Sequence, residues 1–360
     1  VMDALGTTSK IKVFRLNTVL FGNAFELLLE RKAKSQRPIK KSTEAQYRYS
    51  YKTDLQQWAN KPLIEITPED AESLYRERLK TSKSRANMAF RLIKMVFRFA
   101  KTVYFNDQDQ PILLKSPADK IASLKLQQKL DPRTSYIRND QLNLWFEAVK
   151  ETCTPIVSDL LVFTLLSGFR KNEAATLTWD QVDIRNEVLT LNQNSSKSSI
   201  QIPMSSYITV LLKKRKESVD AKGYVFPAGR KSGFLKDWRK TCAKVASISA
   251  IKFVPQDLHR TFKNIAISLD IDPDAISILV DHCLPNKKVT VRHMGLDFDD
   301  LRDQMQKITD TILDYAGVIK ACDSLDEEEI FLVLDRLVGI ELEVALNRLP
   351  KAQQDRYLTG

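Results

Sequence analysis

The stretch that decides the fold runs Leu165-Leu-Ser-Gly-Phe-Arg170-Lys-Asn-Glu173-Ala-Ala-Thr-Leu177-Thr-Trp179-Asp-Gln-Val-Asp183. An apolar run before it predicts a helix over Ile156 to Leu166. Two runs that alternate like strands follow it, Val188 to Leu191 and Ser199 to Ile202, joined by a polar turn. This order of elements predicts a mainly helical domain with one small antiparallel sheet.

Helical periodicity continues on both sides of that stretch. One predicted helix, Asn139 to Glu151, lies just before the stretch. The helices predicted after it are Tyr207 to Lys216, Lys231 to Ser247, Leu258 to Leu269, Pro273 to Val280 and Asp299 to Tyr315. Nearer the N-terminus they are Asn23 to Ala33, Thr43 to Trp58, Thr67 to Lys80 and Ser84 to Tyr104. In the last of these, apolar residues recur at helical spacing on one face and basic residues lie on another, which predicts a helical domain with a basic side.

A polar stretch marked by prolines separates the two helical regions. Residues 106–133 contain Pro111, Pro117 and Pro132 and break the helical period, as an extended linker does. The predicted organisation is therefore a lead-in segment over 1–21, a helical DNA-binding domain over 22–116, a basic linker over 117–137, a second domain over 138–318 and an acidic helical tail over 319–360.

Composition limits the class of protein. The chain has 360 residues, 43% of them apolar and 28% charged, which suits two folded domains and excludes a disordered or fibrous chain. It has no apolar run of about 18 residues, no signal-peptide pattern at its start, and four cysteines without Cys-x-x-Cys spacing. We therefore expect a soluble, cytoplasmic protein without membrane contact.

The charge pattern indicates a polyanionic partner. The chain contains 56 Lys and Arg residues and 45 Asp and Glu residues, which gives a net charge of +11. Residues 1–135 carry about +12 and residues 321–360 about −5, so nucleic acid is expected to bind mainly to the first third of the chain.

With its neighbouring motifs, the opening stretch resembles the first catalytic-arginine motif of the tyrosine recombinases, the phage-integrase superfamily. The other similar motifs are Val225-Phe-Pro227, Asp257-Leu258-His259-Arg260-Thr261-Phe262, and Leu279-Val-Asp-His282 followed by Val289-Thr290-Val-Arg292. Lys83-Ser-Arg85, which opens a helix, resembles the family's core-binding domain. The resemblance covers roughly residues 22–318 and implies a two-domain clamp around duplex DNA, hence a nucleoid-associated protein.

The resemblance also implies a chemistry. In this family a tyrosine hydroxyl attacks a DNA phosphodiester without a metal or other cofactor, while two arginines offset the charge that develops on the phosphate. A lysine in the sheet turn protonates the leaving oxygen. The family's positions are matched here by Arg170, with Glu173 as its helix companion, by His282 in the third motif, and by Lys197 as the candidate sheet-turn lysine.

Three catalytic positions depart from the family pattern. Gln256 replaces the second-motif histidine, His259 replaces the second arginine, and His293 replaces the tyrosine, or Met294 if the register shifts by one. The sequence therefore predicts an integrase-like protein without strand cleavage. The alternative is an active recombinase with an atypical site or a nucleophile supplied by a partner chain. A nucleophilic His293, and a metal site of the three histidines with Cys283, are further alternatives.

The expected DNA contacts follow from the basic positions. They are Lys40, Lys41, Arg48, Lys52, Lys83, Arg85, Arg91, Lys94, Arg98 and Arg260. The expected role in DNA recombination or integration is accessory, architectural or regulatory. We expect a homo-oligomer on DNA or a hetero-oligomer with an active recombinase, and the apolar stripe Ile330, Leu334 and Leu337 of the tail either docks on a neighbouring subunit or packs on its own domain.

Overall fold

The chain forms two compact units in the computed structural model. The structure describes residues 11–12, 18–113, 115–192, 199–218, 222–229, 233–280, 297–318, 339–349 and 351–359. The N-terminal unit comprises residues 1–132 and the C-terminal unit residues 133–360. The predicted fold class is confirmed, because both units are built mainly of helices and the C-terminal unit contains a small antiparallel sheet.

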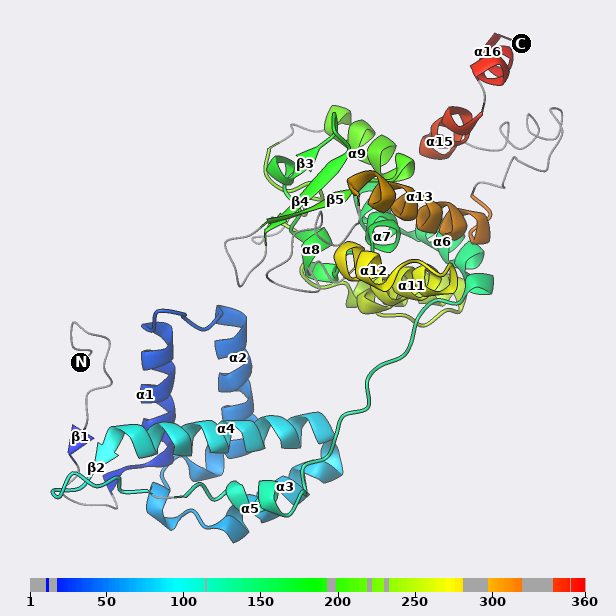
Figure 1. Cartoon of the computed structure of the whole chain (residues 1–360). Coiled ribbons are helices and arrows are strands. Elements are labelled where there is room, and N and C mark those ends of the chain that lie inside the picture. Colours follow the sequence, from blue (N-terminus) through cyan, green and yellow to red (C-terminus); the bar gives the residue numbers. More distant parts are fainter. Residues whose placement is uncertain are drawn as a thin grey trace. The chain divides into compact units, whose positions relative to one another are not determined.

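The N-terminal unit is organised around one long helix. Its elements are β1 (Ile11–Lys12), α1 (Phe21–Ala33), α2 (Lys41–Ser50), the π-helical turn η2 (Tyr51–Leu55), the short turns η3 (Gln56–Trp58) and η4 (Leu63–Glu65), α3 (Pro68–Thr81), α4 (Lys83–Val103), β2 (Tyr104–Phe105) and α5 (Asp119–Ser123). In Figure 1, α1 and α2 stand on one side of α4, and α3 and α5 lie on the other. The inner face of α4 is fully buried at Leu92, Ile93 and Val96, so its basic residues are left on the outside.

The start of α4 is fixed by a buried carboxylate. Asp54 lies in η2 and is 2% exposed, and its Oδ1 atom is 2.6 Å from Nη2 of Arg85 and 3.4 Å from Nε of Arg78. One acidic side chain thus joins η2, α3 and α4. A π-helical turn brings Asp54 to this position because its extra residue shifts the register of the preceding helix.

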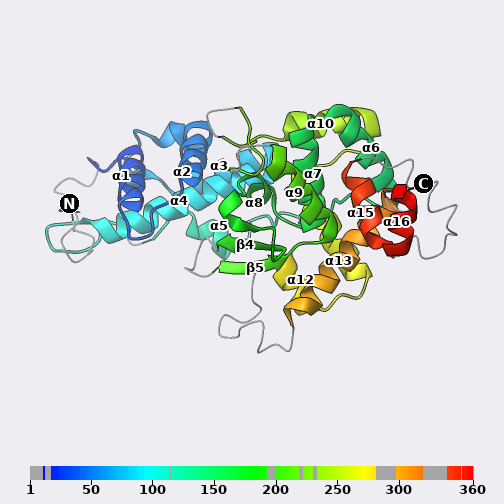
Figure 2. The same cartoon turned by 90° about the horizontal axis from the view of Figure 1, so that it is seen from above.

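The C-terminal unit surrounds an apolar helix. Its elements are η5 (Asn139–Gln141), α6 (Leu142–Thr152), α7 (Pro155–Ser167), α8 (Lys171–Ala175), η6 (Trp179–Gln181), β3 (Val182–Asp183), β4 (Val188–Asn192), β5 (Ser199–Pro203), α9 (Ser206–Ser218), α10 (Arg239–Ser249), α11 (Pro255–Ser268), α12 (Pro273–Leu279), α13 (Phe298–Tyr315), α15 (Ile340–Arg348) and α16 (Lys351–Thr359). Every residue of α7 from Leu160 to Ser167 is buried. Seen from above, α6 and α10 lie side by side (Figure 2).

The sheet and the start of α10 differ from the prediction, and the helix predicted over Thr43 to Trp58 is divided into α2, η2 and η3. The predicted hairpin is confirmed, since β4 pairs with β5 antiparallel with Leu189 opposite Ile202. The short edge strand β3 was not predicted. The helix predicted from Lys231 begins instead at Arg239, because the preceding residues form a bridge between Pro227 and Phe234 and a bond from the Trp238 indole to the Leu235 carbonyl.

The structure places parts of the predicted linker range, 117–137, in each of the two units. Ala118 and Ile121 are buried in the core of the N-terminal unit, and α5 interrupts the expected extended chain. Ile137 is buried in the core of the C-terminal unit. Residues of the linker range therefore belong to both cores.

The described part of the acidic tail packs on its own chain. Glu343 of α15 pairs with Lys214 of α9 at 2.8 Å, and Glu341 pairs with Lys150 of α6 at 2.5 Å. Val344 of α15 is fully buried. The stripe Ile330, Leu334 and Leu337 lies outside the described residues, so docking of the tail on a neighbouring subunit stays a prediction.

Within the part of the chain that the structure describes, no helix has both the length and the apolar character needed to cross a membrane.

Candidate functional site

The turn between α7 and α8 carries Arg170 and is packed against α11. Gly168 ends α7 with φ of +67°, a conformation that disfavours any residue with a Cβ. A Cβ there would also lie 2.7 Å from Cδ1 of Phe262 in α11. The next residue, Phe169, is fully buried, which fixes the direction in which the chain enters α8.

Glu173 is the local partner of Arg170, as predicted. Its Oε2 atom accepts a hydrogen bond from the Arg170 backbone N–H at 2.8 Å, and its Oε1 lies 3.6 Å from the guanidinium Nη1. The Arg170 side chain is nevertheless 40% exposed. Because Glu173 holds the Arg170 backbone while the guanidinium is exposed to solvent, the guanidinium is able to bind a phosphate through paired N–H donors.

Helix α11 carries two of the substituted positions and brings one of them, His259, next to this turn. Gln256 is half-buried in its first turn, whereas His259 is only 5% exposed. The Nδ1 atom of His259 lies 2.6 Å from the carbonyl oxygen of Gly168. The histidine that stands in place of the second arginine therefore binds backbone of the Arg170 turn.

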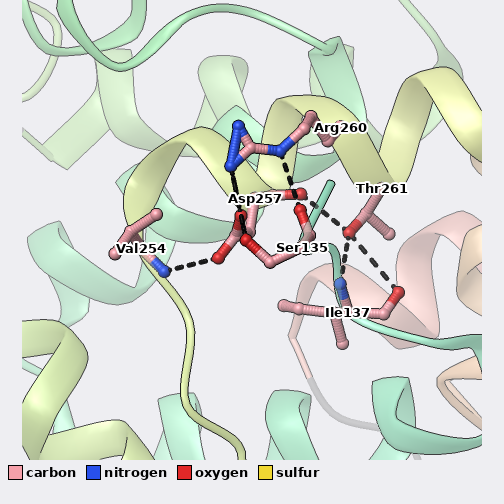
Figure 3. Close-up of polar contacts among 6 residues, drawn as sticks. All are labelled: Ser135, Ile137, Val254, Asp257, Arg260 and Thr261. Carbon is pink, nitrogen blue, oxygen red and sulfur yellow. Dashed lines mark hydrogen bonds and ion pairs between the residues drawn. The ribbon is translucent and has the colours of Figure 1, made fainter. Parts of the chain in front are cut away.

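Arg260 belongs to a separate cluster, the Asp257 clasp, formed by residues 135–137 and α11. Figure 3 shows its contacts. Asp257 is 2% exposed, and its Oδ1 accepts bonds from the Ser135 hydroxyl at 2.8 Å and from Nη2 of Arg260 at 2.7 Å, while its Oδ2 accepts from the Val254 N–H at 2.8 Å. Nε of Arg260 donates to the Ser135 carbonyl at 2.7 Å. Arg260, predicted to contact DNA, thus also binds its own chain.

A second contact completes the Asp257 clasp. The hydroxyl of Thr261 accepts a bond from the Ile137 N–H at 2.9 Å and donates to the Asp257 carbonyl at 2.8 Å, as Figure 3 also shows. Sequence patterns did not indicate this clasp, because its two halves are more than 120 residues apart in the chain.

The remaining predicted catalytic positions lie outside the described residues. They are Lys197, His282, His293 and Met294, and Cys283 of the alternative metal site lies there too. Among the predicted catalytic positions, the structure therefore brings together Arg170 and His259, with Gln256 one helical turn before His259.

The predicted DNA-binding side chains of the N-terminal unit form two groups, apart from Lys94. In one group carboxylates already bind the cation: Arg48 bonds Glu26 and Glu44 at 2.8 Å, Arg85 bonds Asp54, and Lys83 lies 3.6 Å from Asp131. The other group consists of exposed residues for which the described part of the chain supplies no carboxylate, namely Lys40, Lys41, Lys52, Arg91 and Arg98. Lys94 is half-buried, with its ammonium 6.0 Å from the centre of the Phe90 ring.

Basic side chains from two segments surround one hollow, which we call the basic notch. Lys94, Arg98 and Lys101 of α4 meet Lys115 of the following loop around a cavity of about 180 Å³. The loop is fixed by Leu113, which is buried, and by a bond of 3.0 Å from the Ser116 N–H to Asp119. The sequence predicted DNA contacts for Lys94 and Arg98, but it did not indicate that Lys115 returns to α4.

Lys120 of the linker range differs from Lys115. Its ammonium bonds Glu69 at 2.9 Å and lies 3.4 Å from Glu72. Both carboxylates raise the pKa of Lys120 above its ordinary value. Of these two lysines, Lys115 faces the basic notch and Lys120 is paired with carboxylates.

Comparison with known proteins gives a consistent result. Residues 135–291 match the model of the phage integrase family. The chain is 25% identical over 268 residues to the prophage integrase IntF of Escherichia coli strain K12. That match includes 72% of this chain but 56% of the relative, so the chain spans little more than half of the relative's length.

Solved structures with a similar fold include two DNA-bound integrases. The lambda integrase tetramer bound to a Holliday junction matches with a TM-score of 0.59 and 13% identity, over 76% of this chain and 80% of that chain. The Tn1549 transposon integrase with transposon right end DNA matches with a TM-score of 0.56 and 16% identity, over 79% of this chain and 98% of that chain. At these identities the likeness concerns the fold.

Proposed function

We propose that the C-terminal unit of this chain, in which residues 135–291 match the phage integrase family model, is a member of the tyrosine recombinase superfamily. The proposed function is that of an integrase-like protein of a prophage or another mobile element, which binds duplex DNA during integration or recombination without cleaving a strand itself. An accessory, architectural or regulatory role follows. One observation carries this proposal. Arg170 is exposed, but His259, which stands in place of the second arginine, is buried and bonded to the Gly168 carbonyl.

Two substitutions support the proposed absence of strand cleavage: the second arginine and the nucleophilic tyrosine of the family are both replaced. A phosphoryl transfer of this kind needs cations on the non-bridging oxygens, and removal of one such donor typically costs two or more orders of magnitude in rate. His259 uses its Nδ1 for the Gly168 carbonyl and is 5% exposed, so it is a poor substitute for a bidentate guanidinium. His293 at the tyrosine position lacks the hydroxyl that would form the phosphotyrosine.

Binding of DNA is supported by the N-terminal unit. The basic notch places four cations and one carboxylate, Asp119, around one hollow, and Arg98 and Lys115 form no ion pair among the described residues. Because the cations outnumber the carboxylate, the hollow keeps an excess of positive charge that favours a bound anion. A backbone phosphate of duplex DNA supplies that anion, with a strong dependence on salt.

The second candidate is an active recombinase, with an atypical site or with a nucleophile from a partner chain. It is favoured by the retained pair Arg170 and Glu173, which has the arrangement expected of a working site. In either case we propose a homo-oligomer on DNA or a hetero-oligomer with an active recombinase, associated with the nucleoid.

Salt-dependent DNA binding is the test of the proposed function. We expect the full chain to capture specific fragments from a genomic library, and the logarithm of its affinity for such a duplex to fall linearly with the logarithm of salt concentration. Binding is measured by fluorescence anisotropy between about 50 and 200 mM salt, a range over which several phosphate contacts produce about a 1,000-fold loss. Absence of salt-dependent binding to any fragment contradicts the proposed function.

A second prediction concerns the contribution of the basic notch to this salt dependence. The double change Arg98→Gln and Lys115→Gln should reduce the slope of that plot by about 1 to 2, since each lost phosphate contact removes about 0.9. Arg76→Gln is the matched control, because Arg76 is an exposed arginine of the same unit already paired with Glu72. An unchanged slope in the double variant shows that DNA does not use the notch, even where the wild type binds.

A further inference from the structure

Two residues of α11 hold the turn from which Arg170 projects. His259 and Phe262 are three positions apart, so they lie on one face of the helix. His259 contacts the Gly168 carbonyl at 2.6 Å, and the Phe262 ring occupies the space beside the Gly168 α-carbon. Both side chains are buried. The end of α7 is thus held by a polar contact and by packing from the same helix.

The direction of the hydrogen bond follows from its acceptor. A carbonyl oxygen has no proton to give, so Nδ1 of His259 carries the proton and donates it. The carbonyl belongs to Gly168, the residue that caps the C-terminus of α7, where carbonyls lack an intrahelical partner. The imidazole N–H of His259 therefore donates a hydrogen bond to a carbonyl oxygen that has no donor within the helix, and it does so in a buried position.

We propose that His259 is a positioning residue for Arg170. The bond to Gly168 fixes the backbone two residues before Arg170, and the bond from the Arg170 N–H to Glu173 fixes the residue itself. With this backbone held and the guanidinium 3.6 Å from Glu173 Oε1, the side chain projects from a fixed position and loses less entropy on binding a phosphate than it would from a mobile turn. The inference rests on the proposed function, in which Arg170 contacts a DNA phosphate, and it gives the substituted position 259 a role of its own.

A purely structural role for His259 is the competing explanation. In that case the bond to Gly168 stabilises the fold of the C-terminal unit, and its loss affects DNA binding independently of Arg170. The two explanations differ in one measurable quantity, the coupling between positions 259 and 170 in DNA affinity, which a double-mutant cycle isolates.

The test combines variants at the two positions. Arg170→Gln should lower affinity for the selected duplex about tenfold, since a charge-assisted contact is lost. His259→Leu removes the donor at similar size and should lower affinity at least threefold. The double variant should bind within twofold of Arg170→Gln alone, because a side chain that is absent needs no positioning. His259→Asn keeps a nitrogen donor at the same number of bonds from the backbone and should bind like the wild type.

Each outcome decides between the explanations. Independent effects, in which the losses of the two single variants multiply, overturn the positioning role and leave the proposed function intact. If Arg170→Gln has no effect on a duplex that the wild type binds, the phosphate contact itself is absent and the inference fails with it. If His259→Leu does not fold, His259→Gln replaces it, because its amide lies one bond further out and misses the carbonyl. The same cycle and the same criteria then apply.

Discussion

No covalent protein–DNA adduct is expected when the wild-type protein is incubated with a suicide duplex nicked beside the scissile phosphate. Adducts of this kind are detected as a shifted band on a denaturing gel. The expectation follows from His293 at the tyrosine position and His259 at the second arginine position. A covalent adduct with the wild-type protein would falsify the non-cleaving assignment, and loss of that adduct in His293→Ala would then identify the histidine as the nucleophile.

Restoring the family residues should produce the largest gain of activity. The triple change Gln256→His, His259→Arg and His293→Tyr should produce an adduct, in which the tyrosine oxygen bonds to phosphorus as the bond to the 5′-oxygen breaks and a proton passes to that oxygen. The single change His293→Tyr should remain at least about 100-fold slower than the triple variant, since the second arginine is still missing. Equal rates for the single and triple variants would show that an arginine at position 259 is not needed for cleavage.

Loss of the Asp257 carboxylate should strongly destabilise the C-terminal unit. Asp257→Ala leaves the Ser135 hydroxyl, the Val254 N–H and the Arg260 guanidinium without their buried acceptor. Removing one partner of a buried ion pair typically costs about 3–5 kcal/mol in the free energy of unfolding. The expected result is a large shift of the urea midpoint to lower concentration.

Tryptophan fluorescence is the suitable probe for that measurement. Three of the four tryptophans, Trp145, Trp179 and Trp238, belong to the C-terminal unit, so the transition reports mainly on it. Asp140→Ala is the matched control, because Asp140 pairs with Arg138 at 2.9 Å on the exposed surface of the same unit. Little change of midpoint is expected there, since surface ion pairs contribute little. Equal shifts in the two variants would mean that the clasp stabilises the unit no more than a surface ion pair does.

Local patterns were sufficient for the helices and the hairpin. The period of apolar residues that predicted a helix from Ser84 corresponds to α4, whose inner face is buried at those positions. The alternation around Leu189 and Ile202 corresponds to the paired strands β4 and β5. Such patterns are visible in sequence because burial of one face repeats with the period of the element.

Contacts between distant segments were not predictable in the same way. The motif identified Arg170, Glu173 and position 259 as parts of one site, but nothing near His259 in sequence indicates that its ring meets the Gly168 carbonyl 91 residues earlier. The start of α10 was predicted too early because the bridge between Pro227 and Phe234 prevents helix formation there. Tertiary structure overrides local propensity at such positions.

The Asp257 clasp has a mechanical consequence. Residues 135–137 enter the C-terminal unit before α6, yet their polar bonds go to α11, the helix that carries Gln256 and His259. If the chain before Ser135 is pulled, the bonds of the Asp257 clasp therefore transmit the force to α11 before it reaches α6. Tension in the connecting segment and the geometry around Arg170 are, for this reason, linked through one helix.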